Sequence, residues 1–217
     1  PHFNKAKLIW PHFQSRGSFL VEREPHYLNN KCFFFAEADY ALLAFLNSRI
    51  AWFCLTSLAR VKRGGYIEAE AQYVGALPAL PSGSEETLAS LARSATEDQE
   101  ALSTLSKVVR HRLGDLNPSV SGSATLSDWF ALSFANLQAE LAKRFKTTFP
   151  VAERDEWERW FEGKRVEAAT LAGRIAETEA EIDSRVYRLF DLTATEIAAI
   201  EDALRVASPA LSLDSYE

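Results

Sequence analysis

The chain has 217 residues, which suffices for one large domain or two small ones around a buried core. Hydrophobic residues make up 47% and charged residues 25%, a composition that excludes a disordered tail and predicts a soluble globular protein. No apolar run approaches the ~20 residues that a membrane-spanning helix needs. The net charge of −6 is uneven, because residues 1–81 carry +3 and residues 82–217 carry −9. This asymmetry favours a front part that faces a polyanion.

The first residue and the cysteines also bear on the class of protein. The chain begins at Pro1 and has no methionine, so we interpret it as a fragment of a longer protein. Cys32 and Cys54 stand alone, without the CxxC spacing or the histidine cluster of a zinc site. We therefore expect buried free thiols and no bound metal. Free thiols and the lack of a signal-peptide pattern fit a cytoplasmic location.

The first third of the sequence is predicted to mix strands with one helix. Asp39 is expected to cap a helix that fades near Ala59. After the break at Gly64-Gly65, residues 66–74 predict a strand or an extended segment. Three short apolar runs come first: residues 6–10 form a run stopped by Pro11, and the second and third runs, 18–21 and 31–36, predict strands that are expected to form a hairpin.

From residue 82 the chain is predicted to be helical almost to its end. Ser127 or Asp128 is expected to cap the second helix of this part, and Thr193 with Glu196 forms a capping box before the last. The predicted helices cover about 85–113, 127–145, 153–190 and 194–206. The third carries an apolar seam made of Trp157, Phe161, Ala168, Leu171, Ile175, Ile182 and Leu189.

Apolar seams on long helices with charged outer faces predict an antiparallel helical hairpin or bundle. The predicted fold class is therefore α+β. A small mixed α/β lobe is expected over residues 1–81, and an all-α lobe over residues 82–217.

Motifs for enzymatic chemistry are missing from the sequence. It has no Gly-rich phosphate loop, GxGxxG, HExxH or GxSxG, and no Asn-Pro-Pro segment of the kind that grips a flipped base. The histidines, His12 among them, are scattered. Glu68 and Glu70 alternate on a predicted strand and could do acid–base work, but a solvated strand face explains them more simply. We expect no catalytic site in this chain.

Four segments of the front third, in order and spacing, resemble the TaqI-like C-terminal specificity domain of N6-adenine DNA methyltransferases, which include type IIG restriction–modification enzymes. They are LIWPHFQSRGSFLV (8–21), YLNNKCFFF (27–35), LLAFLNSRIAWFCL (42–55) and RGGYIEAEAQYVGALPALP (63–81). Three later segments resemble the helical extension of the larger members: DWFALSF (128–134), DEWERWFEGK (155–164) and EIDSRVYRLFDLTATEIAAIE (181–201). One departure is Asp191, where relatives usually carry glycine.

The resemblance implies a division of labour within a larger parent protein. An upstream methyltransferase domain would bind S-adenosylmethionine and methylate adenine, and it would be the neighbour of this chain. The chain itself would hold no cofactor, lie across double-stranded DNA and recognise the target sequence.

The candidate DNA-binding residues are of types that contact bases or phosphates. The strongest cluster runs from Arg60 to Tyr66, where three cations precede two glycines and an aromatic residue follows. The alternative is a turn that holds the fold, with Arg63 paired to a carboxylate such as Glu68. The full set is Arg16, Asn30, Lys31, Arg49, Arg60, Lys62, Arg63, Gly64, Gly65, Tyr66 and Gln72.

A second hypothesis belongs to a different class of function. The seams of the 85–113 and 153–190 helices could dock another chain or brace two domains, in a structural or partner-binding module without direct DNA contact. The two hypotheses are compatible, because a helical spacer can support a lobe that contacts DNA.

Overall fold

The computed structural model describes residues 4–81, 83, 85–122 and 126–207. The chain folds into two compact units: unit 1 comprises Pro1–Ser94 with Thr178–Glu217, and unit 2 comprises Ala95–Glu177. The boundaries between the units follow Ser94 and Glu177, whereas the boundary predicted from the sequence follows residue 81. The predicted α+β class is confirmed, because small sheets near the N-terminus precede a long helical part.

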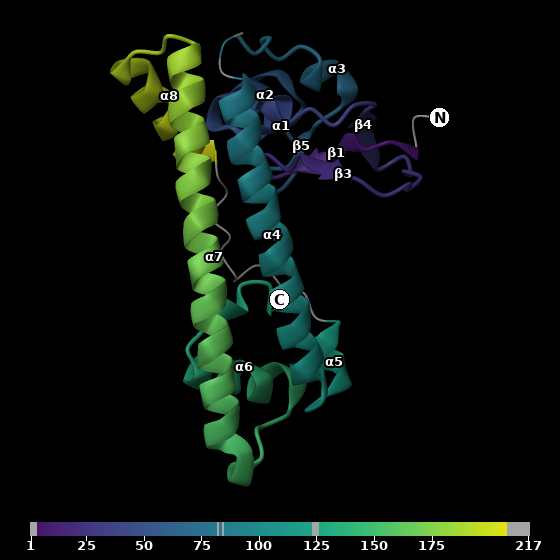
Figure 1. The fold of residues 1–217 in the computed structure, drawn as a ribbon, viewed down its shortest axis with the longest axis vertical. Coiled ribbons are helices and arrows are strands. Elements are labelled where there is room, and N and C mark those ends of the chain that lie inside the picture. The colour runs from purple at the N-terminus through teal and green to yellow at the C-terminus, as the bar shows by residue number, and fades with distance from the viewer. Residues whose placement is uncertain (1–3, 82, 84, 123–125, 208–217) are drawn as a thin grey trace. The chain divides into compact units, whose positions relative to one another are not determined.

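A three-stranded antiparallel sheet lies in unit 1, with the order β3-β1-β4 (Figure 1). It consists of β1 (Lys7–Pro11), β3 (Leu20–Glu22) and β4 (Cys32–Phe35). The predicted hairpin between the second and third apolar runs is wrong, because both runs pair with β1 instead. Leu8 and Trp10 of β1 are almost fully buried, so the strand with the most buried residues takes the centre of the sheet.

Two helices replace the single helix predicted after Asp39. They are α1 (Tyr40–Asn47) and α2 (Arg49–Leu58), bent by 65° at Ser48. The Ser48 hydroxyl donates to the Phe45 carbonyl at 2.6 Å and accepts from the Ala51 N–H, so one side chain ends α1 and begins α2. The predicted cap at Asp39 is confirmed, because its carboxylate accepts the first N–H groups of α1.

The segment predicted as a strand over residues 66–74 is extended only at its start. β5 (Ile67–Glu68) pairs with the two-residue strand β2 (Phe13–Gln14), and α3 (Ala71–Val74) follows. The partner strand β2 is only two residues long, and the last bond to this segment is the one from the Ala69 N–H to the His12 carbonyl, so the residues after Ala69 have no ladder to join and close a helical turn instead.

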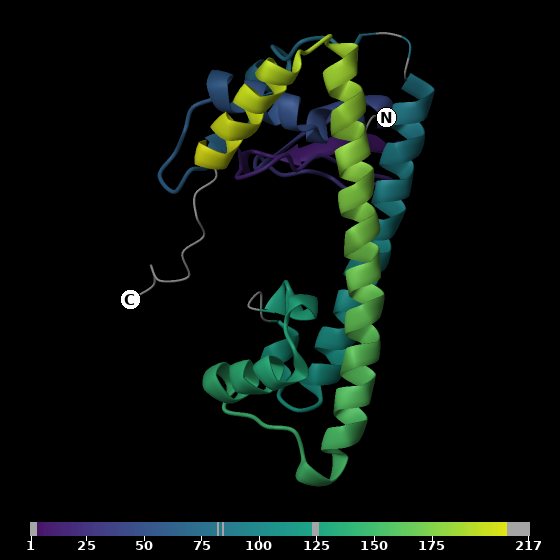
Figure 2. The ribbon, with the colours of Figure 1, turned by 90° about the vertical axis from the view of Figure 1, so that its left-hand side faces the viewer.

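The core of unit 1 is built from both ends of the sequence. The Trp10 indole packs within it and donates to the Ala69 carbonyl at 2.7 Å. The second half of α7 (Arg154–Leu189) contributes Ile182 and Val186 to the same core, and α8 (Ala194–Ala207) packs against α2 (Figure 2). Both cysteines are free and partly buried, and burial raises the pKa of the Cys54 thiol.

Unit 2 is helical and has a core of its own. The predicted helix over 127–145 is wrong in its first part: a short 3-10 turn, η3 (Trp129–Ala131), comes first, and α6 (Phe134–Phe145) begins only after Ser133. The Ser133 hydroxyl accepts the Asn136 N–H and is the N-cap that the sequence assigned to Ser127 or Asp128. The remaining elements are α4 (Glu85–Gly114) from Ala95 onward, α5 (Pro118–Ser121), η4 (Val151–Glu153) and α7 up to Glu177.

Within unit 2, the end of α4 and the start of α7 run antiparallel to each other (Figure 1), as the apolar seams predict. Five of the seven seam residues are buried, namely Trp157, Phe161, Ala168, Ile175 and Ile182, although the last belongs to the core of unit 1. Arg174 of α7 binds Asp98 of α4 through two guanidinium nitrogens.

The C-terminal helix begins with the predicted capping box. Thr193 donates its N–H to the Glu196 carboxylate at 2.8 Å, and the Glu196 N–H returns to the Thr193 hydroxyl. No single helix among the described residues has the length and apolar composition to cross a membrane; α1 and α2 meet those two criteria only as a bent pair.

Candidate nucleic-acid interface

A tight hairpin carries the strongest cluster predicted from the sequence. The Lys62 N–H donates to the Tyr66 carbonyl at 2.6 Å, and Val61 pairs with Ile67. Gly64 and Gly65 form the tip with φ values of 85° and 77°, a left-handed conformation that residues with a Cβ rarely adopt. The tip is therefore narrow and has no side chain at either glycine.

The three cations of this hairpin have different surroundings. Lys62 binds the Glu68 carboxylate, with 3.0 Å between Nζ and Oε1. In the alternative interpretation of this cluster, Arg63 pairs with a carboxylate such as Glu68, but it is Lys62 that makes the ion pair with Glu68. Arg60 and Arg63 are exposed, and neither side chain forms an ion pair with a described residue. Two guanidinium groups are therefore available for an external anion.

The fold joins a turn from a distant part of the sequence, which carries Lys31, to the strand pair β2–β5. β2 lies beside β5, and the His12 N–H just before β2 donates to the Lys31 carbonyl at 2.8 Å. The Asn29 side chain accepts the Lys31 N–H at 2.9 Å and so fixes the turn on which Asn30 and Lys31 are exposed. Phe13, the residue after His12, is 42% exposed.

Gln72 joins the same neighbourhood through Glu70. Its amide donates to Glu70 Oε2 at 2.7 Å at the start of α3. Nine of the eleven predicted residues therefore lie on neighbouring segments. We call this set the basic edge: Asn30, Lys31, Arg60, Lys62, Arg63, Gly64, Gly65, Tyr66 and Gln72.

Arg16 and Arg49 do not belong to the basic edge. The backbone beside Arg16 approaches the end of α1. Burial raises the pKa of Glu179 of α7, and the positive charge of Arg16 lowers it. The Arg49 guanidinium binds the Glu201 carboxylate through two nitrogens, and the Arg49 backbone N–H donates to Asp183 at 2.8 Å. Both arginines thus interact with acidic side chains of α7 or α8, and the bonds of Arg49 fix the start of α2 to those two helices.

Asp183 is the most perturbed carboxyl of this acidic region. Burial raises its pKa to about 6, against the hydrogen bond from Arg49 and the Arg49 charge, which lower it. The hydroxyl of Tyr187 donates to Glu201 at 2.6 Å, and its pKa is raised, first by burial and then by that bond.

Sequence reasoning missed a cluster beside the basic edge. One ligand-type atom from each of His12, Glu68 and Glu70 lies within 4.8 Å of the others. The expected solvated face is wrong for Glu68, which is only 8% exposed. The alternation of Glu68 and Glu70 was the available signal, but their burial depends on the pairing of β5 with β2, which lies more than 50 residues away in sequence.

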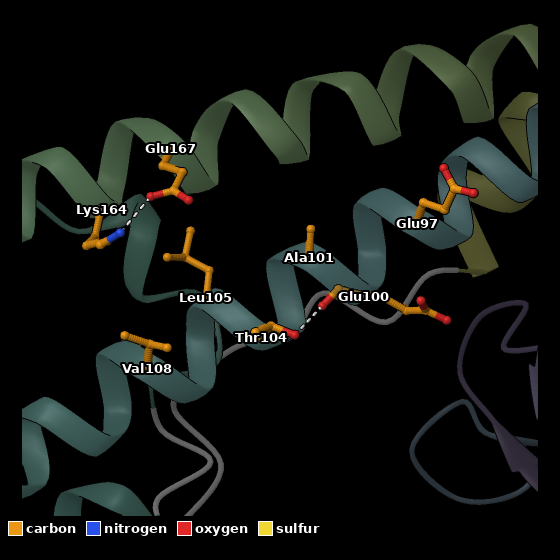
Figure 3. Close-up of a pocket in the computed structure, with 8 residues that line it drawn as sticks. All are labelled: Glu97, Glu100, Ala101, Thr104, Leu105, Val108, Lys164 and Glu167. Atoms are coloured by element: carbon orange, nitrogen blue, oxygen red, sulfur yellow. Dashed lines mark hydrogen bonds and ion pairs between the residues drawn. The ribbon is translucent and has the colours of Figure 1, made fainter. Parts of the chain in front are cut away.

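Unit 2 presents a different kind of surface. A shallow groove of about 520 Å³ runs between α4 and α7 (Figure 3). Leu105 and Val108 supply its apolar part, and its charged rim is mostly acidic, with Glu97, Glu100 and Glu167 against Lys164. Such a rim repels phosphate groups.

Comparisons with known proteins bear on the helical part alone. Residues 82–186 match the model of a family described as a domain of unknown function, DUF8810. No curated protein matches the chain significantly, and no solved structure does. The matched segment includes all of unit 2 and begins where the sequence predicts the helical lobe to begin. The basic edge lies outside it.

Proposed function

We propose that this chain recognises a DNA target sequence, as the C-terminal part of a site-specific adenine-N6 DNA methyltransferase or restriction–modification enzyme. The observation that supports this most directly is the hairpin. Arg60 at its base and Arg63 beside Gly64 are exposed and without ion-pair partners among the described residues, and the two glycines leave the tip without side chains. Lys31 adds a third cation from the neighbouring turn.

The chemistry of the basic edge suits a duplex. Arginine and lysine side chains and backbone N–H groups are the usual partners of DNA phosphates, while asparagine and glutamine amides bind adenine edges. In this proposal Arg60, Arg63 and Lys31 bind phosphates, and Asn30 is the residue that is free to reach a base. Gln72 is already engaged by Glu70 and would have to leave it to contact a base.

The parent enzyme in this proposal carries its catalytic domain upstream of this chain. That domain would bind S-adenosylmethionine and perform the methyl transfer, and this chain would supply the sequence recognition. The sequence resemblance over four ordered segments supports this assignment, and the missing cofactor and flipped-base motifs agree with it.

The test is binding of a fluorescently labelled duplex of mixed sequence, followed by anisotropy between about 50 and 200 mM salt. We expect wild-type affinity to fall steeply with salt. The double variant Arg60→Ala/Arg63→Ala should bind on the order of tenfold more weakly, and the slope of log K against log salt should become shallower by roughly 2, about one for each lost phosphate contact.

The matched control removes the same charge from unit 2. Arg154→Ala/Arg159→Ala changes two exposed arginines near the start of α7, and it should leave both the affinity and the salt slope unchanged. If both double variants weaken binding equally, only net charge matters and the hairpin is no contact. If the wild-type chain binds no duplex at low salt, the proposal fails.

The groove of unit 2 favours a second function, in which the helical part binds a protein partner. Its apolar floor and acidic rim suit an amphipathic helix with basic flanks. In that case sedimentation should detect self-association or a complex with such a helix, and Val108→Glu should abolish it without affecting DNA binding.

A further inference from the structure

We propose that His12, Glu68 and Glu70 form a binding site for Zn²⁺ between β2 and β5. The three side chains come from segments that only the fold brings together. The Ala69 N–H donates to the His12 carbonyl at 2.7 Å, which fixes the backbone positions of the two segments, and Glu68 and Glu70 flank Ala69 on either side.

The imidazole of His12 is held in place and has a free nitrogen. Its ring stacks on Phe13, with centroids 4.4 Å apart, and Phe33 meets it edge-on at 5.6 Å. Nε2 is buried and makes no hydrogen bond with any described residue, although Glu70 Oε1 lies 3.6 Å away. A buried nitrogen without a partner is costly, and binding a cation would satisfy it.

The donor set selects the metal. One imidazole and two carboxylates suit a borderline ion such as Zn²⁺, which commonly takes three protein ligands and a water molecule. Mg²⁺ avoids imidazole and demands octahedral oxygen coordination. Ligand atoms around tetrahedral zinc lie about 3.4 Å apart, so the cluster, whose ligand atoms lie within 4.8 Å of one another, must contract by up to about 1.4 Å. Glu70, whose side chain is 33% exposed, has the freedom to do so.

Lys62 is the competitor for this site. Its ammonium group already binds Glu68 Oε1 at 3.0 Å and partly neutralises the cluster. An incoming dication must displace that group or bind through the other Glu68 oxygen, because two cations on one carboxylate oxygen repel each other. Removal of Lys62 should therefore strengthen metal binding.

The experiment is isothermal titration of the 217-residue chain with ZnCl₂, repeated with Co²⁺, whose visible absorption reports four-coordinate binding. We expect one saturable site. Glu70→Gln should weaken the affinity at least tenfold, and this partly exposed residue can be changed with the fold intact. Lys62→Met should strengthen the affinity several-fold, and tenfold excess Mg²⁺ should not compete.

The control is His26→Gln, which removes the imidazole of an exposed His–Glu pair, His26 with Glu22, in the same unit. It should leave the zinc affinity unchanged. The proposal is overturned if zinc does not bind saturably, if Glu70→Gln binds as tightly as wild type, or if His26→Gln loses as much affinity as Glu70→Gln. An affinity that does not rise in Lys62→Met contradicts the assignment of Glu68 as a ligand.

Discussion

At the scale of the residue, Asp183 shows how burial turns a carboxyl group into a pH-dependent element of stability. Its side chain accepts the Arg49 N–H at the start of α2, while Glu179 and Glu201 add negative charge nearby. Burial, the largest cause, raises its pKa from 3.8 to about 6. The folded chain therefore binds a proton here more tightly than the unfolded chain does.

The sign of the pH dependence follows from that difference. The stabilisation from protonated Asp183 is complete below about pH 4 and is lost as the pH rises through 6. We predict that Asp183→Asn, which keeps an oxygen for the Arg49 N–H, is about as stable as wild type at pH 4 and more stable at pH 7.5 by about 1–3 kcal/mol. Urea denaturation at both pH values measures this.

Asp202→Asn provides the control, because Asp202 is exposed on α8. Its effect should stay within about 0.5 kcal/mol at both pH values. A difference between Asp183→Asn and wild type that is the same at pH 4 and pH 7.5 would contradict the role given to Asp183.

At the scale of the element, the end of α7 has an unusual residue at its turn. The Leu192 N–H donates to the Tyr187 carbonyl at 3.1 Å, which closes the helix in a Schellman-type cap. Asp191 occupies the left-handed position of this cap, with φ of 51°. This is the position at which the family that the sequence resembles usually carries glycine, and glycine adopts that conformation without steric cost.

Asp191→Gly is therefore predicted to stabilise the chain by about 0.5–1 kcal/mol. Thermal unfolding measures the gain as a higher midpoint temperature. Asp191→Ala separates the effect of losing the carboxylate from the effect of losing the Cβ. It removes the carboxylate and keeps the Cβ, so it should bring no gain. If alanine stabilises as much as glycine, the conformation at this turn is not the cause.

Also at the scale of the element, the sequence predicts helices better than strand pairing. The long helices over 85–113 and 153–190 match α4 and α7, because their apolar spacing recurs along most of their length, although Asp98, Lys164 and Thr178 interrupt it. The break at Ser48 escaped prediction because apolar spacing continues across it, and only the hydroxyl contacts end one helix and begin the next. The pairing of β1 with both neighbours depends on long-range contacts that local patterns do not encode.

The same distinction holds for the candidate site. The Arg60–Tyr66 hairpin was predictable, because cations, glycines and an aromatic residue follow one another closely in the sequence. The role of Arg49 was not, since its partners Asp183 and Glu201 lie more than 130 residues away. The cluster of His12 with Glu68 and Glu70 escaped for the same reason.

At the scale of the whole molecule, the core of unit 1 depends on two distant stretches of chain. Residues 178–207 supply buried side chains to it, namely Ile182, Val186, Tyr187, Ile200 and Leu204. Burial of each is worth about 1.5–3 kcal/mol, so together they rival the usual stability of a domain, about 5–15 kcal/mol. Unit 2, by contrast, is contiguous in sequence and has its own cluster of buried aromatic residues.

We predict that a chain ending at Glu177 leaves residues 1–94 unfolded while residues 95–177 stay helical. Limited trypsin digestion with mass spectrometry should show rapid cleavage in the first segment and protection in the second. The full chain under the same conditions is the reference and should resist in both. A protected fragment spanning residues 1–94 from the truncated chain would show that the C-terminal helices are dispensable.

Unit 1 is made of two stretches of chain with unit 2 between them in sequence, and this has a consequence for biosynthesis. Translation proceeds at roughly 5–20 residues per second, so residues 1–94 leave the ribosome on the order of ten seconds before α8 does. During that interval the apolar faces of α1 and α2 lack their last partners, while the middle of the chain already holds everything its own core requires. Residues 95–177 can therefore fold before residues 1–94, whose apolar surface stays uncovered until α8 has been made.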